Sequence, residues 1–201
     1  MSAQEFWNVI GNYNNQTLFI QIVLLSILVL AIVLSYLKKL NWAAKIALGI
    51  ANLFIGIAFF ADYGTEPIQI FFVMLLFIVS GILFLYEAWK NKDDELNKPS
   101  VFQIILLSLY AVYPLFSVAF GATFPQMVTH IMPCPVTSLS IVAYSGYKLK
   151  NRVLLALLTI WGFTGIKSIF FNVYEDLILL ICGFYGLFVL IKMFQNGKVK
   201  K

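Results

Sequence analysis

The sequence predicts an all-α fold: a polytopic membrane protein with seven transmembrane helices, its N-terminus outside and its C-terminus in the cytoplasm. Of the 201 residues, 61% are hydrophobic and 11% are charged, whereas a soluble domain carries roughly 25% charged residues. Apolar runs long enough to cross the hydrocarbon core as helices recur along the chain. Lysine and arginine gather in every second connection between these runs, which indicates the orientation.

A single integral-membrane helical domain is expected over residues 1–201. The longest polar stretch, 90–99, is short enough to be a loop. It leaves no room for a separate soluble domain, since domains need at least about 50 residues. Residues 195–201 are expected to form a basic cytoplasmic tail.

Residues 1–16 are predicted to form an interfacial segment on the outer surface. Phe6, Ile10 and Tyr13 recur at helical spacing, which is typical of a helix with one apolar face. Trp7 and Tyr13 carry side chains that favour the headgroup region. We therefore expect a short helix that lies along the membrane surface.

Each predicted span is an apolar run bounded by polar or charged residues. The first ends at Lys38 and Lys39, the third before the lysine-rich loop, and the sixth begins after Arg152. The seventh follows an acidic pair, Glu175 and Asp176. The spans cover about residues 17–37, 43–60, 68–86, 101–120, a fifth that ends near Tyr147, 153–173 and 177–194.

The basic residues test both the number of spans and their orientation. With an external N-terminus, 13 of the 14 basic residues fall in cytoplasmic segments, and only Lys167 lies on the other side. The cytoplasmic set is Lys38, Lys39, Lys45, Lys90, Lys92, Lys98, Lys148, Lys150, Arg152, Lys192, Lys198, Lys200 and Lys201. The positive-inside rule therefore predicts a multi-pass protein of the cytoplasmic (inner) membrane. The net charge of +5 then faces anionic lipid, and no nucleic-acid partner is expected.

The start of the fifth span is the least ordinary part of the chain. Cys134 lies between Pro133 and Pro135, and a proline inside a helix costs about 3 kcal/mol, whereas the first helical position accepts it. One alternative is a helix that begins near Pro125 and is kinked at the two prolines. We favour a helix that begins at the proline pair, with residues 124–133 re-entering the membrane beside a pocket.

Several polar side chains are candidates for lining this outward-facing pocket. Cys134, Thr137 and Ser138 lie at the predicted helix start, where free amide groups could hold an anion or a carbonyl. The alternative is that the Pro-Cys-Pro motif is only a rigid cap that fixes the helix.

Lys167 is a second candidate, because a lysine within a span is a functional hypothesis that needs a partner. The acidic residues expected on the same side are Asp62, Glu66, Glu175 and Asp176. The alternative is that Lys167 extends to the surface without a functional partner. We include Lys167, Glu175 and Asp176 among the substrate-binding candidates.

Other residues within the spans are expected to have structural roles. Asn52, near the middle of the second span, is expected to join two helices by a hydrogen bond. Tyr113 and Pro114 mark a kink in the fourth span. Gly162 and Gly165 are expected to permit close contact between helices.

No cofactor is expected. The single histidine excludes haem held by two histidines within one chain, and the last span has no lysine in 177–191 for a retinal Schiff base. A soft-ligand set for copper, formed by Met127, His130, Met132 and Cys134, is a minor alternative. An enzyme that uses Cys134 and His130 and a Cys134–Cys182 disulfide are further minor alternatives.

A set of short motifs resembles an uncharacterised prokaryotic integral-membrane family, a domain of unknown function that is sometimes loosely labelled a permease. The motifs are Tyr113-Pro114, Phe124-Pro125, the Pro-Cys-Pro-Val-Thr run at 133–137, Trp161-Gly162 with Gly165, and the acidic pair Glu175-Asp176 before the last span. The resemblance carries Pro133, Cys134, Pro135, Thr137, Glu175 and Asp176 over as family positions. Val136 departs from a Thr-Thr pattern, and Ala122 stands where the family has a histidine. The resemblance implies the architecture and supplies no activity.

The sequence predicts a protein that binds or transports a small polar molecule or ion through the outward-facing pocket. The main alternative is a non-transporting sensor or assembly subunit that binds a membrane partner or a second copy of itself. The partner that follows directly from composition is the lipid bilayer.

Overall fold

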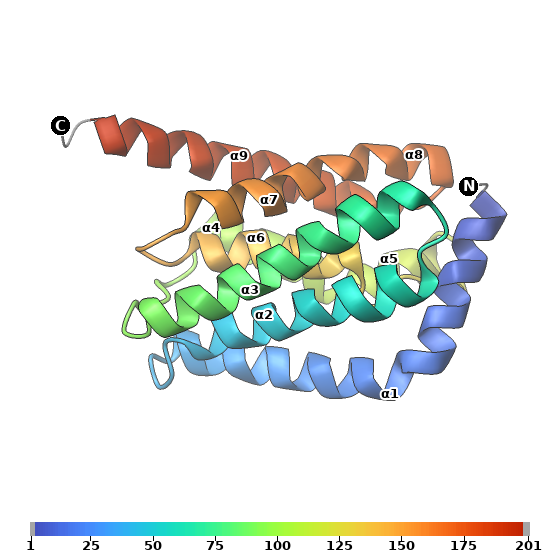
Figure 1. The fold of residues 1–201 in the computed structure, drawn as a ribbon, viewed down its shortest axis with the longest axis horizontal. Coiled ribbons are helices and arrows are strands. Elements are labelled where there is room, and N and C mark those ends of the chain that lie inside the picture. The colour runs from blue at the N-terminus through green and yellow to red at the C-terminus, as the bar shows by residue number, and fades with distance from the viewer. Residues whose placement is uncertain (1–2, 199–201) are drawn as a thin grey trace.

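A computed structural model gives the structure of residues 3–198, in which helices run side by side in an elongated bundle (Figure 1). The all-α prediction is confirmed: helices and connecting loops make up this part of the chain, and its two β-bridges are isolated. The N-terminus lies at one end of the bundle and the C-terminus at the other (Figure 1). Of the predicted tail 195–201, residues 195–198 continue the last helix and 199–201 lie outside the described residues.

The order of elements follows the apolar runs of the sequence. The helices are α1 (Ala3–Tyr36), α2 (Ala43–Phe54), η1 (Ile55–Ala61), η2 (Gln69–Val73), α3 (Met74–Lys90), α4 (Val101–Ala111), α5 (Tyr113–Ala119), α6 (Pro133–Ser145), α7 (Arg152–Phe163), η3 (Thr164–Lys167), α8 (Ser168–Phe171), η4 (Tyr174–Asp176) and α9 (Leu177–Lys198). The π-helical segment η1 continues α2, and the π-helical segment η2 leads into α3. Each of these two pairs forms one continuous apolar helix.

Among the described residues, five continuous helices are long and apolar enough to cross a membrane, or six if the bent pair α4–α5 counts as one span. The sequence predicts seven spans. The difference lies at α6, whose 13 residues make a helix of about 20 Å, shorter than the hydrocarbon core. The predicted kink at Tyr113 and Pro114 is confirmed, since α4 and α5 meet at 54°.

Helix α6 forms the centre of the bundle. It packs against α2, α4, α7 and α9, and every residue except Cys134 and Ser145 is buried. The predicted role of Asn52 is confirmed, because its side-chain amide donates to Ser140 Oγ at 3.2 Å and joins α2 to α6. The buried hydroxyl of Ser140 thus serves helix association.

The two prolines are placed at the start of α6, as the favoured alternative predicts. The first intrahelical bond runs from Val136 N to Met132 O at 3.0 Å. Pro133 and Pro135 therefore occupy the first turn, where backbone N–H groups have no intrahelical partner. The motif costs no hydrogen bond and fixes the helix start.

Small residues bring α7 and α9 into close contact. A Cβ atom on Gly162 would lie 2.6 Å from Gly183 Cα, and one on Gly165 would lie 2.7 Å from Leu180 N. No side chain fits at either distance, so the two backbones touch directly. The predicted role of Gly162 and Gly165 in helix contact is confirmed.

The two ends of the bundle differ in charge. We call the end formed by connections 37–42, 91–100 and 146–151 the basic end, because 11 of the 12 described basic residues belong to it or to the helix turns beside it. We call the end formed by 62–68, 120–132 and 164–176, with the N-terminus, the acidic end. Five of the nine acidic residues and one basic residue lie there.

Part of α1 lies across the acidic end. Figure 1 shows that its first, dark blue turns cross the ends of the other helices before α1 turns to run beside α2. The sequence predicts a separate surface helix over residues 1–16, whereas the structure has one helix that bends. That those first turns lie in the membrane interface stays a prediction.

Candidate functional site

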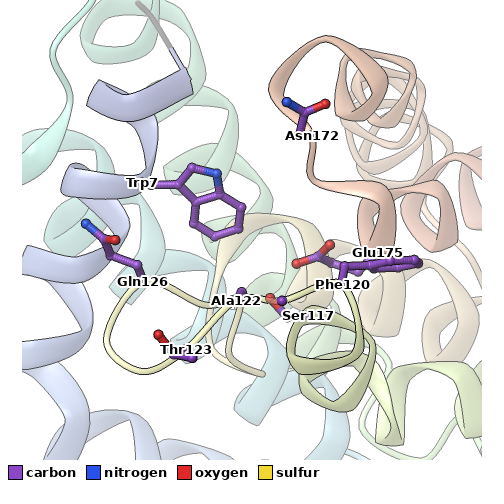
Figure 2. Close-up of a pocket in the computed structure, with 9 residues that line it drawn as sticks. Trp7, Ser117, Phe120, Ala122, Thr123, Gln126, Asn172 and Glu175 are labelled. Carbon is purple, nitrogen blue, oxygen red and sulfur yellow. The ribbon is translucent and has the colours of Figure 1, made fainter.

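A cavity opens at the acidic end, between the first turns of α1 and the connections around α5 and η4 (Figure 2). Its volume is about 300 Å³, at the lower limit of small-molecule pockets. The lining residues come from five separate segments and are Trp7, Ser117, Phe120, Gly121, Ala122, Thr123, Gln126, Asn172 and Glu175.

Glu175 is the chemically distinctive residue of this cavity. Its side chain is 3% exposed, and Oε1 has no hydrogen-bond partner among the described residues. The Ser117 hydroxyl is the one side chain that interacts with the carboxylate from the cavity wall. A buried carboxylate oxygen without a partner is costly, so Glu175 is the first candidate for contact with a bound ion, water or small molecule.

The turn before α9 directs the acidic pair in two directions. Asn172 adopts the left-handed conformation with φ of 56°, which ends α8 and suits asparagine better than most residues. Glu175 and Asp176 then follow in a 3-10 turn, where successive side chains point about 120° apart. Glu175 faces the cavity, whereas Asp176 faces the interior of the bundle.

Asp176 belongs to a buried cluster behind the cavity. The Tyr113 hydroxyl donates to Asp176 Oδ1 at 2.7 Å, and the thiol of Cys134 lies against the same carboxylate. Tyr113 is fully buried, and Asp176 is 8% exposed. The structure therefore brings together the proline-flanked cysteine and the second residue of the acidic pair, which lie 42 positions apart in the sequence.

The loop 120–132 that forms one wall of the cavity is held by α1. Asn14 Nδ2 donates to Pro125 O at 2.7 Å and to Met127 O at 2.8 Å. Tyr13 Oη donates to Ile131 O at 2.6 Å. These buried bonds satisfy the carbonyl groups of an irregular segment, which fixes its shape.

The aromatic wall opposite Glu175 is Trp7. Figure 2 shows the indole of Trp7 and the carboxylate of Glu175 directed toward each other across the cavity, with Ser117 beneath them. Trp7 is held on the first turns of α1, and its ring packs edge-on against Phe6 at a centroid distance of 5.7 Å. The cavity therefore joins one carboxylate and one aromatic side chain.

The structure places the remaining predicted site residues away from the cavity. Thr137 and Ser138 are buried in α6, where Ser138 Oγ donates to Cys134 O at 2.9 Å. Lys167 is exposed, and no hydrogen bond or ion pair joins it to another described residue. Of the predicted pocket residues, only Glu175 lines the observed cavity.

The residues of the minor copper alternative have other contacts. His130 Nε2 lies 3.2 Å from Ala111 O, and its ring packs against Tyr110. The sulfur of Met132 accepts from Thr129 N at 3.2 Å. Within residues 3–198, no three His, Cys, Asp or Glu side chains form a group that could hold a metal ion. Both cysteines are free thiols.

Sequence reasoning missed three residues that build the cavity. Trp7 was expected only at the membrane surface, and Ser117 and Asn14 were not singled out. A signal for Asn14 exists, because Asn14, Thr17 and Gln21 form a polar stripe on one face of an otherwise apolar helix. Nothing in the sequence indicates that this stripe faces the loop more than 100 residues away.

Residues 3–201 match the model of a family of unknown function, DUF6064. The chain belongs to this family. This match confirms the resemblance to a domain of unknown function, and it extends over nearly the whole chain. Comparison with curated proteins and with solved structures gave no match. The activity of this DUF6064 chain therefore has to be inferred from its own site.

Proposed function

We propose that this chain is a seven-span protein of the cytoplasmic membrane that binds a small polar molecule or ion in the cavity at its acidic end. The acidic end faces outward, and the basic end faces the cytoplasm. The observation that carries the proposal is the buried, incompletely bonded carboxylate of Glu175 inside a cavity of about 300 Å³.

The distribution of charge supports this orientation. Eleven described lysines and arginines gather at the basic end, against one at the acidic end, and lysine-rich connections stay in the cytoplasm. The basic loops also contact one another: Lys38 pairs with Glu95 at 2.6 Å, and Leu96 forms a bridge with Tyr147. Three connections that the sequence assigns to one side are therefore adjacent in space.

The position of α6 supports a seventh crossing. Helix α6 alone is too short to span the core, but the loop 120–132 precedes it and lies between α1 and α5. Irregular backbone at membrane depth is tolerated where protein buries it. The loop and α6 together would complete one passage through the bundle from the acidic end to the basic end.

Cysteine labelling in intact cells tests the orientation. We expect Ala122→Cys, in the cavity wall, to react with a membrane-impermeant maleimide from outside, and Lys92→Cys, in a basic loop, to react only after permeabilisation. The parent chain is the control, because Cys134 is partly buried and Cys182 is buried. The opposite pattern would overturn the orientation.

A solute screen tests the binding. The unfolding temperature of the purified chain is measured with amines, amino acids, carboxylates, sugars and inorganic ions, because a ligand that binds the folded state raises it. We expect at least one solute to stabilise the native chain and to leave Glu175→Gln unchanged. Equal shifts in both proteins, or none in either, would contradict the proposal. Uptake of a positive solute into proteoliposomes then separates a carrier from a receptor.

A further inference from the structure

We infer that the cavity at the acidic end accepts a small organic cation of the ammonium class, held between the Glu175 carboxylate and the Trp7 indole. This inference rests on the proposed function and names its ligand class. Four features of the described residues carry it: the missing counter-charge of Glu175, the aromatic face opposite it, the lack of a metal-binding ligand set, and the field of the acidic end.

The first feature is the missing counter-charge. Glu175 is buried and interacts with the neutral Ser117, and no described lysine or arginine forms an ion pair with it. At the basic end, a buried charge has a partner of opposite sign: Lys45 is fully buried, and its Nζ lies 3.5 Å from Asp94 Oδ2. Buried charges in proteins are paired, so the partner of Glu175 is expected to be a cation from solution.

The second feature is the aromatic side chain that lines the cavity, Trp7. The Trp7 indole is directed toward the Glu175 carboxylate across the cavity (Figure 2). The face of an indole attracts a cation within about 6 Å of the ring centre, and recognition of alkylammonium groups uses this contact. A carboxylate on one side and an indole on the other together match an ammonium group that carries apolar substituents.

The third feature argues against a divalent metal ion. Ca²⁺ and Mg²⁺ take six or more oxygen ligands, whereas the cavity offers one carboxylate and the neutral side chains of Ser117, Thr123, Gln126 and Asn172. The nearby loop carbonyls Pro125 O and Met127 O already accept bonds from Asn14. Among the described residues, no group of three candidate metal-ligating side chains exists.

The fourth feature is the field of the whole acidic end. Its acidic residues outnumber its basic residue, and they are Glu5, Asp62, Glu66, Glu175 and Asp176, against Lys167. A surface of one sign raises the local concentration of ions of the opposite sign. The cavity volume of about 300 Å³ limits the ligand to a small molecule.

The test uses choline as the cationic probe and 3,3-dimethylbutan-1-ol as an uncharged probe of the same shape. Binding to the purified full chain in lipid nanodiscs is measured by titration calorimetry. We expect choline to bind at least about tenfold more tightly than the alcohol, because only choline supplies the charge that pairs with Glu175. Equal affinity for the two probes, or no choline binding to the folded chain, would overturn the inference.

Variants locate the contact. Glu175→Gln is expected to weaken choline binding by at least about tenfold, since it removes the pairing charge. Asp62→Asn is the control, because it removes the same charge from an exposed position at the same end and outside the cavity. If Asp62→Asn weakened binding as much as Glu175→Gln, the surface field and not the cavity would hold the cation, and the inference would fail.

The indole is tested in parallel. Trp7→Leu is expected to weaken choline binding by about 3- to 30-fold, and Trp7→Phe by less. Phe124→Leu is the aromatic control, because Phe124 is an exposed aromatic residue at the same end and does not line the cavity. Unchanged binding in Trp7→Leu would remove the indole from the site.

The two proposals fail in different ways. If the solute screen finds a neutral or anionic ligand that requires Glu175, the cation inference is wrong and the binding function stands. If no solute requires Glu175 and Ala122→Cys does not react with maleimide in the folded chain, the cavity is not a binding site and both proposals are wrong. Each variant is first compared with the native chain by its unfolding temperature, so that loss of binding is not confused with loss of fold.

Discussion

The two ends of this bundle both bury charged side chains, and they do so in opposite ways. At the basic end, the ammonium of Lys45 is fully buried, interacts with Asp94 and Asn91 O, and lies 4.2 Å from the centre of the Tyr147 ring. At the acidic end, Glu175 is as deeply buried, and one of its oxygens has no partner among the described residues. The paired charge of Lys45 joins loops, whereas the unpaired carboxylate oxygen of Glu175 is the basis of the proposed binding site.

The basic end has the contacts of a structural junction. Asp94 accepts from Leu149 N at 3.1 Å in addition to its pair with Lys45. Asn97 donates to Gly146 O at 2.7 Å. These bonds connect the loop 91–100 to the end of α6 and to α2. The comparison predicts that charge removal destabilises this end and leaves the other end folded.

The largest expected effect comes from Lys45→Met. This change leaves Asp94 buried without its cation, and breaking a buried pair costs about 3–5 kcal/mol of the free energy of unfolding. Equilibrium unfolding of the purified chain in mixed micelles measures it. The double variant Lys45→Met/Asp94→Leu should regain most of the loss, because both charges are then absent. A loss below about 1 kcal/mol in the single variant would mean that the pair is open to water.

The second effect concerns the cluster behind the cavity. Tyr113→Phe removes the donor to Asp176 and should lower the free energy of unfolding by about 1–3 kcal/mol, because the buried acceptor loses a partner. Tyr110→Phe is the matched control, since the Tyr110 hydroxyl is buried and has no hydrogen-bond partner among the described residues. We expect that control to be neutral or stabilising. Equal losses in both variants would show that ring packing, and not the hydrogen bond, is measured.

The third expected change in the free energy of unfolding comes from replacing one buried glutamate at each end. Glu175→Gln should change the free energy of unfolding by less than about 1 kcal/mol or raise it, because it removes a buried charge that lacks a partner. Glu87→Gln should lower it by about 1–2 kcal/mol, because Glu87 Oε2 accepts from Asn91 Nδ2 at 2.7 Å. If Glu175→Gln were the more damaging of the two, Glu175 would have a structural role.

The smallest effect is expected for the exposed pair of Lys38 and Glu95, whose nitrogen–oxygen distance is 2.6 Å. The Lys38 ammonium, by hydrogen bond and charge, lowers the pKa of the Glu95 carboxyl below its ordinary value. The contribution of the pair is therefore present at neutral pH and is lost as the pH falls through the lowered pKa of Glu95. Lys38→Met should leave stability at neutral pH nearly unchanged, since solvent screens the pair. A loss as large as that of Lys45→Met would contradict the contrast between the two pairs.

Local chemistry made several parts of this protein predictable. Pro133 and Pro135 mark the start of α6 because proline lacks the N–H that a helix interior requires. Pro114 marks the bend between α4 and α5 for the same reason. A polar side chain within an apolar span needs a hydrogen-bond partner, and Ser140 is the partner of Asn52. In each case, one residue type has few acceptable surroundings.

The cavity was only partly predictable. The acidic pair and Cys134 were singled out, and Asp176 and Cys134 do meet. Tyr113 donates a hydrogen bond to Asp176, and Trp7 lies across the cavity from Glu175. Both residues lie on helices whose packing cannot be predicted from the sequence. The sequence predicts Lys45 to be an ordinary basic residue of a cytoplasmic segment, whereas the structure buries its side chain fully. Its burial depends on how the loop 91–100 folds over α2.

The sequence by itself determined an all-helical chain with several helices apolar enough to cross a membrane, the segregation of its charges and the points where helices begin, bend and touch. Those properties follow from transfer free energies and backbone chemistry, which act on each segment separately. Tertiary structure alone decided that Glu175 faces a cavity while Asp176 faces Tyr113, and that α1 holds the loop 120–132. These choices depend on contacts between residues more than 50 positions apart, which no local property encodes.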